Sequence, residues 1–284
     1  MMMTPLLLGL LLRSHQNDAP FSVIEKVTYR TVAKKKLLLD IYRPSDKTGP
    51  VPYALVIHGG SWIGGQRTDM APLCEALAKR GIAAVTIDYR LAPANKWPAM
   101  LEDCEVAYSF LSSKASLYGL NKDRVVAVGA SAGGHLAMLM AFKDTEEGAQ
   151  KEGVPKHLKF RGILNLFGPT QLNEDFPADL QDAVSKTVLG RPFSQASDIA
   201  AGMSPVNFVT RDSPPVFTIH GESDPLVPVM QAKRLDKALT AVGVTSVLRL
   251  IPGMGHELKI GLPACLLAIE DGFSFLSKRL NAKK

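Results

Sequence analysis

Short apolar runs alternate with longer helical stretches along most of this 284-residue chain, and no other feature limits its fold so strongly. The expected strands lie at 53–57, 83–87, 125–128, 162–167, 215–219 and 246–251, and the expected helices near 71–80, 100–114, 133–142, 230–242 and 262–280. Strands that alternate with helices of about 10–15 residues predict an α/β fold, with a mostly parallel central sheet and helices on both faces. Ligands of such a sheet bind at the carboxyl ends of its strands.

The start of the chain follows a different pattern. Residues 27–32 and 37–42 favour strands, and the basic triplet Lys34-Lys35-Lys36 separates them. This pattern predicts an N-terminal antiparallel hairpin ahead of the parallel strands. A hydrophobic content of 46% is enough for residues 21–284 to bury the core of a single domain, and it excludes disordered, collagenous and coiled-coil chains.

Two segments interrupt the alternation. Residues 143–159 are highly charged and contain glycine, which predicts a surface insertion. Residues 169–215 contain several Pro, Asp and Ser with weak periodicity, which predicts irregular helices and loops. Because loops at the strand ends of such sheets carry function, we expect this second segment to be a lid-like insertion over the strand ends.

The N-terminal residues 1–20 raise a question of targeting. The apolar run at 5–12 has the length of the hydrophobic part of a secretory signal peptide and is far too short to span a bilayer. No Lys or Arg precedes the run, and no clear cleavage site follows it. A signal peptide would make the protein secreted or periplasmic, whereas a disordered start would leave it cytoplasmic, and both interpretations stay open. We expect no stable membrane insertion.

The distribution of charge argues against nucleic acid as a partner. The net charge of +6 comes from 33 Lys and Arg against 27 Asp and Glu, and the basic residues do not cluster strongly. Without a recognition motif or a basic run interleaved with aromatic residues, we expect no nucleic-acid binding.

The three cysteines, Cys74, Cys104 and Cys265, are too scattered for a disulfide framework or a metal site, so we expect buried thiols. The sequence leaves the oligomeric state open.

The strongest chemical signal is the sequence Gly129-Ala130-Ser131-Ala132-Gly133, which lies between an expected strand and an expected helix. A sharp turn there forces the serine backbone into a strained conformation, and the glycines allow neighbouring backbone to approach closely. The turn exposes the Ser131 hydroxyl above the sheet, and the helix N-terminus directs amide donors to the same point. Ser131 is therefore the candidate nucleophile.

A serine nucleophile needs a base, and six histidines are available. His256 lies in a glycine-rich loop just after the expected strand 246–251, where such a base belongs. His220 ends another strand and is the alternative. The remaining four are expected to be solvated or structural: His15 and His157 in polar surroundings, His58 in a turn and His135 in a helix.

The base in turn needs a carboxylate that fixes its orientation. Asp224 follows an expected strand and precedes a proline, which gives a short, rigid side chain near the strand end. Glu222 lies two residues earlier on the same loop and is the competing candidate. We favour Asp224 as the acid.

The sequence His58-Gly59-Gly60-Ser61-Trp62 follows the expected strand 53–57 and supplies a candidate oxyanion hole. Adjacent glycines let backbone N–H groups point at the site without steric cost. We expect Gly59 and Gly60 to act together with the N–H of Ala132. Trp62 either forms a wall of the substrate pocket or only packs, and the sequence does not decide between them.

Six motifs in order resemble a known superfamily: HGGSW at 58–62, DYRLAP at 88–93, GASAGGHLA at 129–137, SPVNFV at 204–209, HGESDPLVP at 220–228 and PGMGHE at 252–257. The set resembles the α/β-hydrolase esterases and lipases, in which the triad follows the chain order Ser, Asp, His. More narrowly, it resembles the bacterial feruloyl/acetyl-xylan esterase-like branch (BD-FAE type), which borders the hormone-sensitive-lipase-like carboxylesterases. Ser61 stands where the latter group has a third glycine.

These residues together predict a serine carboxylesterase that acts through an acyl-enzyme, with Ser131, His256 and Asp224 as the triad. We expect small-molecule esters with short acyl or aryl groups as substrates, of the feruloyl or acetyl-xylan type, and neither a metal nor an organic cofactor. An amidase or arylformamidase with the same triad is the alternative, and a non-catalytic binding protein on this scaffold is a second. Candidate pocket residues, each of which could equally belong to the core, are Phe167, Met203, Phe208 and Leu226.

Overall fold

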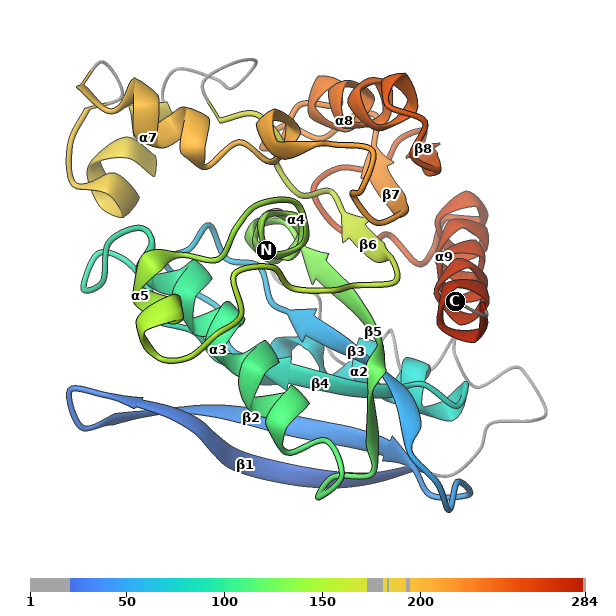
Figure 1. The fold of residues 1–284 in the computed structure, drawn as a ribbon. Coiled ribbons are helices and arrows are strands. Elements are labelled where there is room, and N and C mark those ends of the chain that lie inside the picture. The colour runs from blue at the N-terminus through green and yellow to red at the C-terminus, as the bar shows by residue number, and fades with distance from the viewer. Residues whose placement is uncertain (1–20, 173–180, 183, 193–194, 283–284) are drawn as a thin grey trace.

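The computed structural model describes residues 21–172, 181–182, 184–192 and 195–282. Its centre is an eight-stranded sheet with the strand order β1-β2-β4-β3-β5-β6-β7-β8 (Figure 1). The strands are β1 (Phe21–Val32), β2 (Lys35–Pro44), β3 (Val51–Ile57), β4 (Ala83–Ile87), β5 (Leu120–Ala130), β6 (Ile163–Leu166), β7 (Val216–Gly221) and β8 (Ser246–Ile251). From β4 to β8 all neighbouring strands run parallel, which confirms the predicted α/β sheet.

The predicted N-terminal hairpin is confirmed. β1 and β2 pair antiparallel, and β2 also pairs antiparallel with β4, so the hairpin extends one edge of the parallel sheet. Ala33 and Lys34 connect the two strands with φ angles of 46° and 68°. Positive φ at both central residues matches the right-handed twist of the flanking strands. The basic triplet therefore lies at the hairpin turn and the start of β2.

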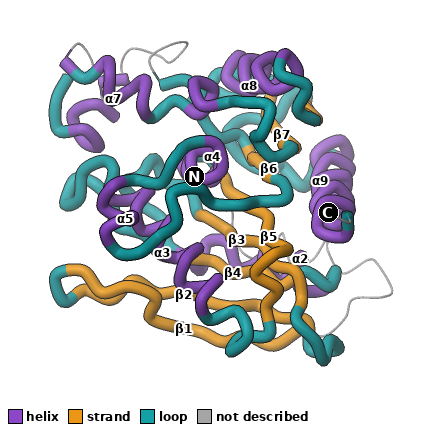
Figure 2. Tube along the Cα trace, in the orientation of Figure 1, coloured by secondary structure: helices purple, strands orange, loops and turns teal. Residues whose placement is uncertain are grey.

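Helices cover both faces of the sheet (Figure 2). The helices α3 (Ala99–Ser113), α4 (Ala132–Phe142) and α8 (Met230–Ala241) pack on one face, and α2 (Ala71–Lys79) and α9 (Pro263–Asn281) pack on the other. The sequence of β3 is apolar throughout because both of its faces are covered. Leu55 and Ile57 face the layer that contains α3, whereas Ala54 and Val56 face the layer that contains α2. A strand buried on both faces needs such a continuous apolar run.

The three cysteines are buried free thiols, as expected. Cys104 lies in the layer with α3, and Cys74 and Cys265 lie in the opposite layer. The charged segment 143–159 contains the short helix α5 (Glu147–Lys151), whose charged ends are exposed while Ala149 is buried against α3. The expected surface insertion is therefore anchored by a small apolar contact.

The described part of segment 169–215 consists of short turns: the π-helical turn η2 (Ser185–Leu189), helix α7 (Ser197–Gly202) and the 3-10 turn η4 (Pro205–Phe208). A further 3-10 turn, η1 (Arg67–Met70), precedes α2. Weak periodicity in the sequence corresponds to these short elements. Trp97 donates its backbone N–H to Val188 O at 3.0 Å, which attaches the segment to the loop before α3.

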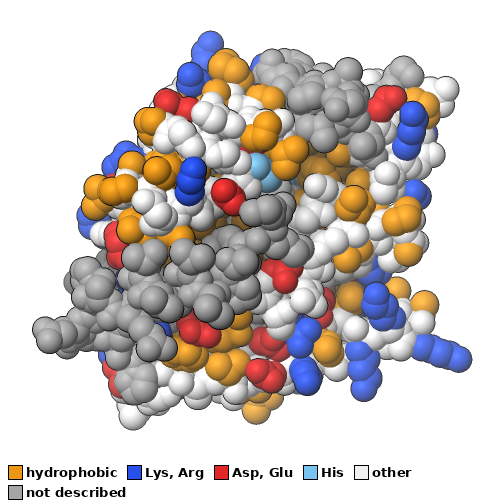
Figure 3. Space-filling model, turned by 180° about the vertical axis from the view of Figure 1, so that it is seen from behind, with side chains coloured by type: hydrophobic (Ala, Val, Ile, Leu, Met, Phe, Trp, Pro, Cys, Tyr) orange, Lys and Arg blue, Asp and Glu red, His pale blue; other side chains and the backbone are white. Residues whose placement is uncertain are grey.

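The surface carries mixed charges. On the face drawn in Figure 3, Lys and Arg side chains lie in several separate groups, with hydrophobic and acidic side chains between them. Within the described residues, no helix combines the length and the apolar character that crossing a membrane requires. The interpretations of residues 1–20 as a signal peptide or a disordered start lie outside the described residues.

Candidate active site

Ser131 lies at a sharp turn between β5 and α4, with φ 53° and ψ −122°. A positive φ is costly for a serine, so the surrounding structure must hold it. The flanking glycines are required sterically: a Cβ on Gly129 would lie 2.2 Å from Gly133 O, and one on Gly133 would lie 2.1 Å from Ile57 O. The Ser131 N–H donates to Leu166 O at 2.8 Å, which fixes the turn to β6. The local geometry is therefore that expected from the Gly-x-Ser-x-Gly pattern.

His256 joins Ser131 to Asp224 from the loop after β8. Its Nε2 lies 2.8 Å from Ser131 Oγ, and its Nδ1 lies 2.7 Å from Asp224 Oδ2. These distances suit an Nδ1–H that donates to the carboxylate while Nε2 accepts from the serine hydroxyl. Three side chains far apart in the sequence thus form one hydrogen-bonded chain at the carboxyl ends of β5, β7 and β8.

The acid loop after β7 is tied to the loop that carries His256. Ser223 donates its backbone N–H to Met254 O at 3.1 Å. Gly221 permits this contact, because a Cβ there would lie 2.1 Å from Met254 O. The acid and the base are therefore held in register by their backbones as well as by their side chains.

The Asp224 carboxylate is buried and well supplied with donors. Its Oδ1 accepts the backbone N–H groups of Leu226 and Val227, each at 2.9 Å. Burial raises the pKa of the Asp224 carboxyl, but the hydrogen bonds from His256 and from the two amides outweigh burial, so this pKa lies below its ordinary value. Glu222, the competing candidate, has an exposed side chain.

The loop after β3 brings its backbone next to the serine. A Cβ on Gly59 would lie 3.2 Å from Ser131 Cβ and 2.9 Å from Ala130 O, so only glycine fits. Gly60 has a φ of 112°, and its carbonyl accepts the N–H groups of Ile63 and Gly64 at 3.0 and 2.9 Å. Ala132 is the first residue of α4, where backbone N–H groups have no partner within the helix. The three candidate oxyanion donors therefore belong to the loop after β3 and to the first turn of α4, which both adjoin Ser131.

Trp62 is 4% exposed and packs its indole edge-on against the His135 ring, with centroids 5.0 Å apart. The Trp62 side chain therefore has a packing role. His135 is also buried, and its Nε2 lies 2.6 Å from Met203 O, so it links α4 to the segment before η4. Burial lowers the pKa of His135 to about 4, which keeps the imidazole neutral.

Of the other histidines, His58 has structural contacts and His157 is exposed, as expected. His58 stacks on Tyr89 with ring centroids 4.1 Å apart, and its carbonyl accepts the Tyr89 hydroxyl at 3.0 Å. His157 is exposed and pairs with Asp144 at 2.7 Å. His220 is buried beside the acid loop, and among the described residues its ring contacts Val227 O and Asp224 Oδ2 and makes no hydrogen bond with Ser131. His15 lies outside the described residues.

Among the candidate pocket residues, two lie close to the hydrogen-bonded chain. Phe167 directs its ring edge-to-face at His256, with centroids 4.9 Å apart, and Leu226 belongs to the acid loop and is 45% exposed. Met203 is fully buried, and Phe208 packs under the Lys143 ammonium group, 5.3 Å from the ring centroid. The contact of Phe167 with His256 joins two loops remote in sequence, and no sequence motif could have indicated it.

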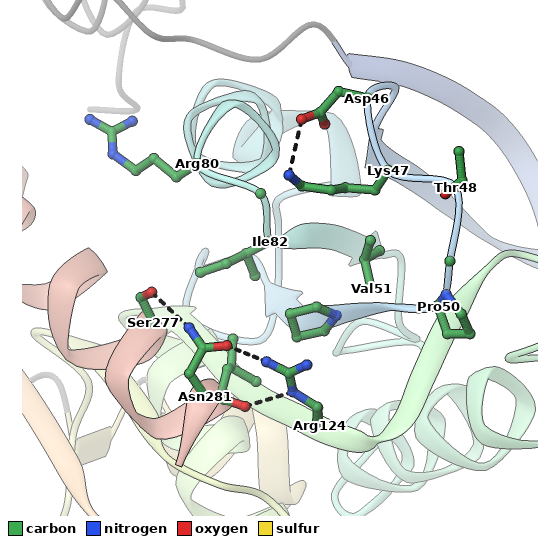
Figure 4. Close-up of a pocket in the computed structure, with 14 residues that line it drawn as sticks. Asp46, Lys47, Thr48, Pro50, Val51, Arg80, Ile82, Arg124, Ser277 and Asn281 are labelled. Atoms are coloured by element: carbon green, nitrogen blue, oxygen red, sulfur yellow. Dashed lines mark hydrogen bonds and ion pairs between the residues drawn. The ribbon is translucent and has the colours of Figure 1, made fainter. Parts of the chain in front are cut away.

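A hollow of about 420 Å³ lies at the other end of the sheet, at the amino ends of β3 and β4. Figure 4 shows Lys47 turned toward Asp46 and Arg124 turned toward Asn281 in this hollow. Lys47 Nζ lies 3.1 Å from Asp46 Oδ2, and Arg124 Nε donates to Leu280 O at 2.7 Å. Its charged groups are thus engaged by the protein itself, remote from Ser131.

The sheet order, the strained serine turn and the helices on both faces define an α/β-hydrolase fold. A truncated form of a carbohydrate esterase from gut microbiota superposes with a TM-score of 0.79 over 94% of this chain and 99% of that chain, at 22% identity. The BD-FAE family model matches residues 39–239, and the chain therefore belongs to the BD-FAE family. This confirms the resemblance drawn from the six motifs.

Two curated relatives from Mycobacterium tuberculosis are similar to this chain. Esterase LipC is 30% identical over 227 residues, which cover 77% of this chain and 56% of LipC. Probable carboxylic ester hydrolase LipM is 32% identical over 201 residues, which cover 69% of this chain and 47% of LipM. The chain thus spans about half the length of these relatives.

Proposed function

We propose that this protein hydrolyses carboxylic esters through an acyl-enzyme formed on Ser131. The observation that carries the proposal is the continuous chain of hydrogen bonds from Ser131 Oγ through His256 to Asp224, at 2.8 and 2.7 Å. Membership of the BD-FAE family and the ester hydrolases among its relatives support the same reaction class.

In the first step, Ser131 Oγ attacks the ester carbonyl carbon while its proton passes to His256 Nε2. The carbonyl π electrons move to the oxygen and give a tetrahedral oxyanion. Backbone N–H groups of Gly59, Gly60 and Ala132 stabilise this oxyanion, and loss of one such donor typically costs about 10²–10³-fold in rate.

The intermediate then collapses and expels the alcohol, which takes the proton from His256 Nε2 as it leaves. Water attacks the resulting acyl-enzyme, with His256 acting again as the base. The acid product departs, and Ser131 regains its proton. No electron acceptor or donor is needed, because every step is an acyl or proton transfer.

Asp224 keeps the base in the correct form through both halves of the reaction. Because its pKa lies below the ordinary value, Asp224 is a carboxylate at neutral pH. A carboxylate at Nδ1 holds the proton there, leaves Nε2 free to accept, and stabilises the imidazolium that forms. An exposed acid such as Glu222 would be screened by water and would fix the ring less firmly.

For substrates, we propose small-molecule esters with short acyl or aryl groups, with feruloyl and acetyl-xylan esters as the first natural candidates. The mixed polarity of segment 169–215 supports this choice, because a lipase that acts on lipid surfaces needs an apolar lid. We propose that this segment covers the strand ends and that Leu226 and Trp62 contribute to the pocket wall.

The test is hydrolysis of p-nitrophenyl esters from acetate to palmitate by the native protein and by Ser131→Ala. We expect activity on the short esters and a loss of at least about 10⁴-fold in the variant. Ser113→Ala, on the exposed end of α3, is the matched control and should keep full activity. Full activity of Ser131→Ala would overturn the assignment of the nucleophile. Hydrolysis of an aryl formamide but of no ester would favour the arylformamidase alternative instead.

A further inference from the structure

His220 occupies a fully buried position at the end of β7, four residues before Asp224. The hydrolytic steps above make no use of it. A buried imidazole beside a buried carboxylate has few ways to satisfy its polar atoms, so its contacts define what it does.

Within the described part of the chain, Nε2 of the His220 ring has a hydrogen-bond partner and Nδ1 has none. Its Nε2 lies 2.7 Å from Val227 O and 3.4 Å from Asp224 Oδ2. A carbonyl can only accept, so the hydrogen lies on Nε2. Burial lowers the pKa of His220, and although the Val227 carbonyl and Asp224 act in the opposite direction, the net pKa stays below its ordinary value. At neutral pH the ring is therefore an uncharged donor.

Val227 connects His220 to the acid. Its carbonyl accepts the His220 Nε2–H, while its N–H donates to Asp224 Oδ1 at 2.9 Å. Val227 is thus hydrogen-bonded through its carbonyl to His220 and through its N–H to Asp224. The other carboxylate oxygen of Asp224, Oδ2, lies close to both His256 and His220. If Val227 moved, the amide that orients Asp224 would move with it.

We propose that His220 is a positioning residue for Asp224, which holds Val227 by its Nε2–H so that the carboxylate faces His256 Nδ1. This inference rests on the proposed function, since it concerns the same triad. His220 contacts no reacting atom and acts only through the acid loop. Misplacement of a triad member by about 1 Å can cost about 10²-fold in rate.

The sharpest test compares two amide variants of His220. His220→Gln places an amide N–H near the position of Nε2, whereas the shorter side chain of His220→Asn cannot reach Val227 O. Both variants bury a similar polar group, so general destabilisation affects them alike. We expect kcat on p-nitrophenyl acetate to fall about 10- to 100-fold in His220→Asn, with KM within about threefold, and most of kcat to return in His220→Gln.

Thr86→Val is the control for loss of a buried hydrogen bond elsewhere. Thr86 is fully buried in β4 and donates its hydroxyl to Arg67 O at 2.8 Å. Its removal should leave kcat within about twofold. Equal kcat in the asparagine and glutamine variants, or an equal loss in Thr86→Val, would overturn the proposal.

A proton NMR measurement separates this inference from the proposed function. The Nδ1–H of His256 in its hydrogen bond to Asp224 should resonate far downfield, and its assignment is checked by its loss in Asp224→Asn. We expect the resonance in the native protein and in His220→Gln, and its loss or upfield shift in His220→Asn. An unchanged resonance in His220→Asn would overturn the positioning role, even in a protein that hydrolyses no ester. Absence of ester hydrolysis by the native protein would count against the proposed function alone.

Discussion

Asp224 and Glu105 are both buried carboxylic acids, yet the structure drives their ionisation in opposite directions. Asp224, in the loop after β7, is 8% exposed, and Glu105, in α3, is 0% exposed. The pKa of Asp224 lies below its ordinary value. Burial raises the pKa of Glu105 to about 8, although a hydrogen bond from the Glu146 amide acts against this.

The difference lies in the number of donors. Asp224 accepts from His256 and from two backbone amides of its own loop. Within the described residues, Glu105 Oε2 accepts only the Glu146 N–H, at 2.9 Å, and Oε1 has no partner. Burial alone would neutralise either acid. In this pair of acids, the additional donors beside His256 accompany the lowered pKa of Asp224, and their scarcity at Glu105 accompanies its raised pKa.

The largest expected effect comes from removing the charge of Asp224. Asp224→Asn keeps the size of the side chain but replaces an acceptor by a group that can donate to His256 and favour the wrong tautomer. We expect kcat on p-nitrophenyl acetate to fall about 10⁴-fold, while the urea midpoint of unfolding changes little. A loss of less than about tenfold in a folded variant would contradict the assignment of Asp224 as the acid.

A second prediction concerns the pH dependence of stability through Glu105. Below pH 4.5, the ordinary pKa of a glutamic acid, the folded and unfolded states both hold this proton. Between pH 4.5 and about 8 the unfolded chain has lost the proton while the folded protein keeps it, so this group makes stability fall as pH rises. Glu105→Gln removes this contribution. Relative to the native protein, we expect the variant to gain about 1–3 kcal/mol in free energy of unfolding between pH 5 and pH 8.

Urea unfolding at several pH values measures this difference directly. Glu147→Gln, at the exposed start of α5, is the matched control, and its stability should follow that of the native protein across the same range. If the free energies of unfolding of Glu105→Gln and of the native protein changed in parallel with pH, Glu105 would ionise normally, and the contrast with Asp224 would disappear.

The smallest expected effect is that of Glu222→Gln. Glu222 lies two residues before Asp224, but its side chain is exposed, and His256 Nδ1 pairs with Asp224 instead. We expect kcat and KM within about twofold of the native values, measured on the same p-nitrophenyl ester. A loss comparable to that of Asp224→Asn would mean that the two loop acids exchange roles in solution.

Much of the fold and of the candidate site could be predicted from local sequence. Apolar runs such as 53–57 are continuous because both faces of the strand are buried. The glycines around Ser131 have no steric substitute, so their pattern marks the turn. His256 and Asp224 each follow a strand, and parallel strands end at the same edge of a sheet. The roles of these side chains in catalysis remain predictions that the experiments above test.

The sequence could not predict contacts between segments that no motif or spacing connects. The His220 contact with Val227 depends on the path of the acid loop after β7, and the contact of Phe167 with His256 depends on two separate loops. Glu105 looks like an ordinary helix-surface acid until the segment 143–159 folds over α3 and buries it. Such effects arise from tertiary packing, which local patterns do not encode.

Covalent labelling tests the central claim most directly. The protein is incubated with diethyl p-nitrophenyl phosphate, which phosphorylates an activated serine and releases p-nitrophenol. Peptide mass spectrometry then locates the adduct. We predict one phosphoryl group per chain, on Ser131, with loss of ester hydrolysis in proportion to labelling and no uptake by Ser131→Ala. An adduct on a different residue, or full activity of a protein labelled at Ser131, would contradict the account.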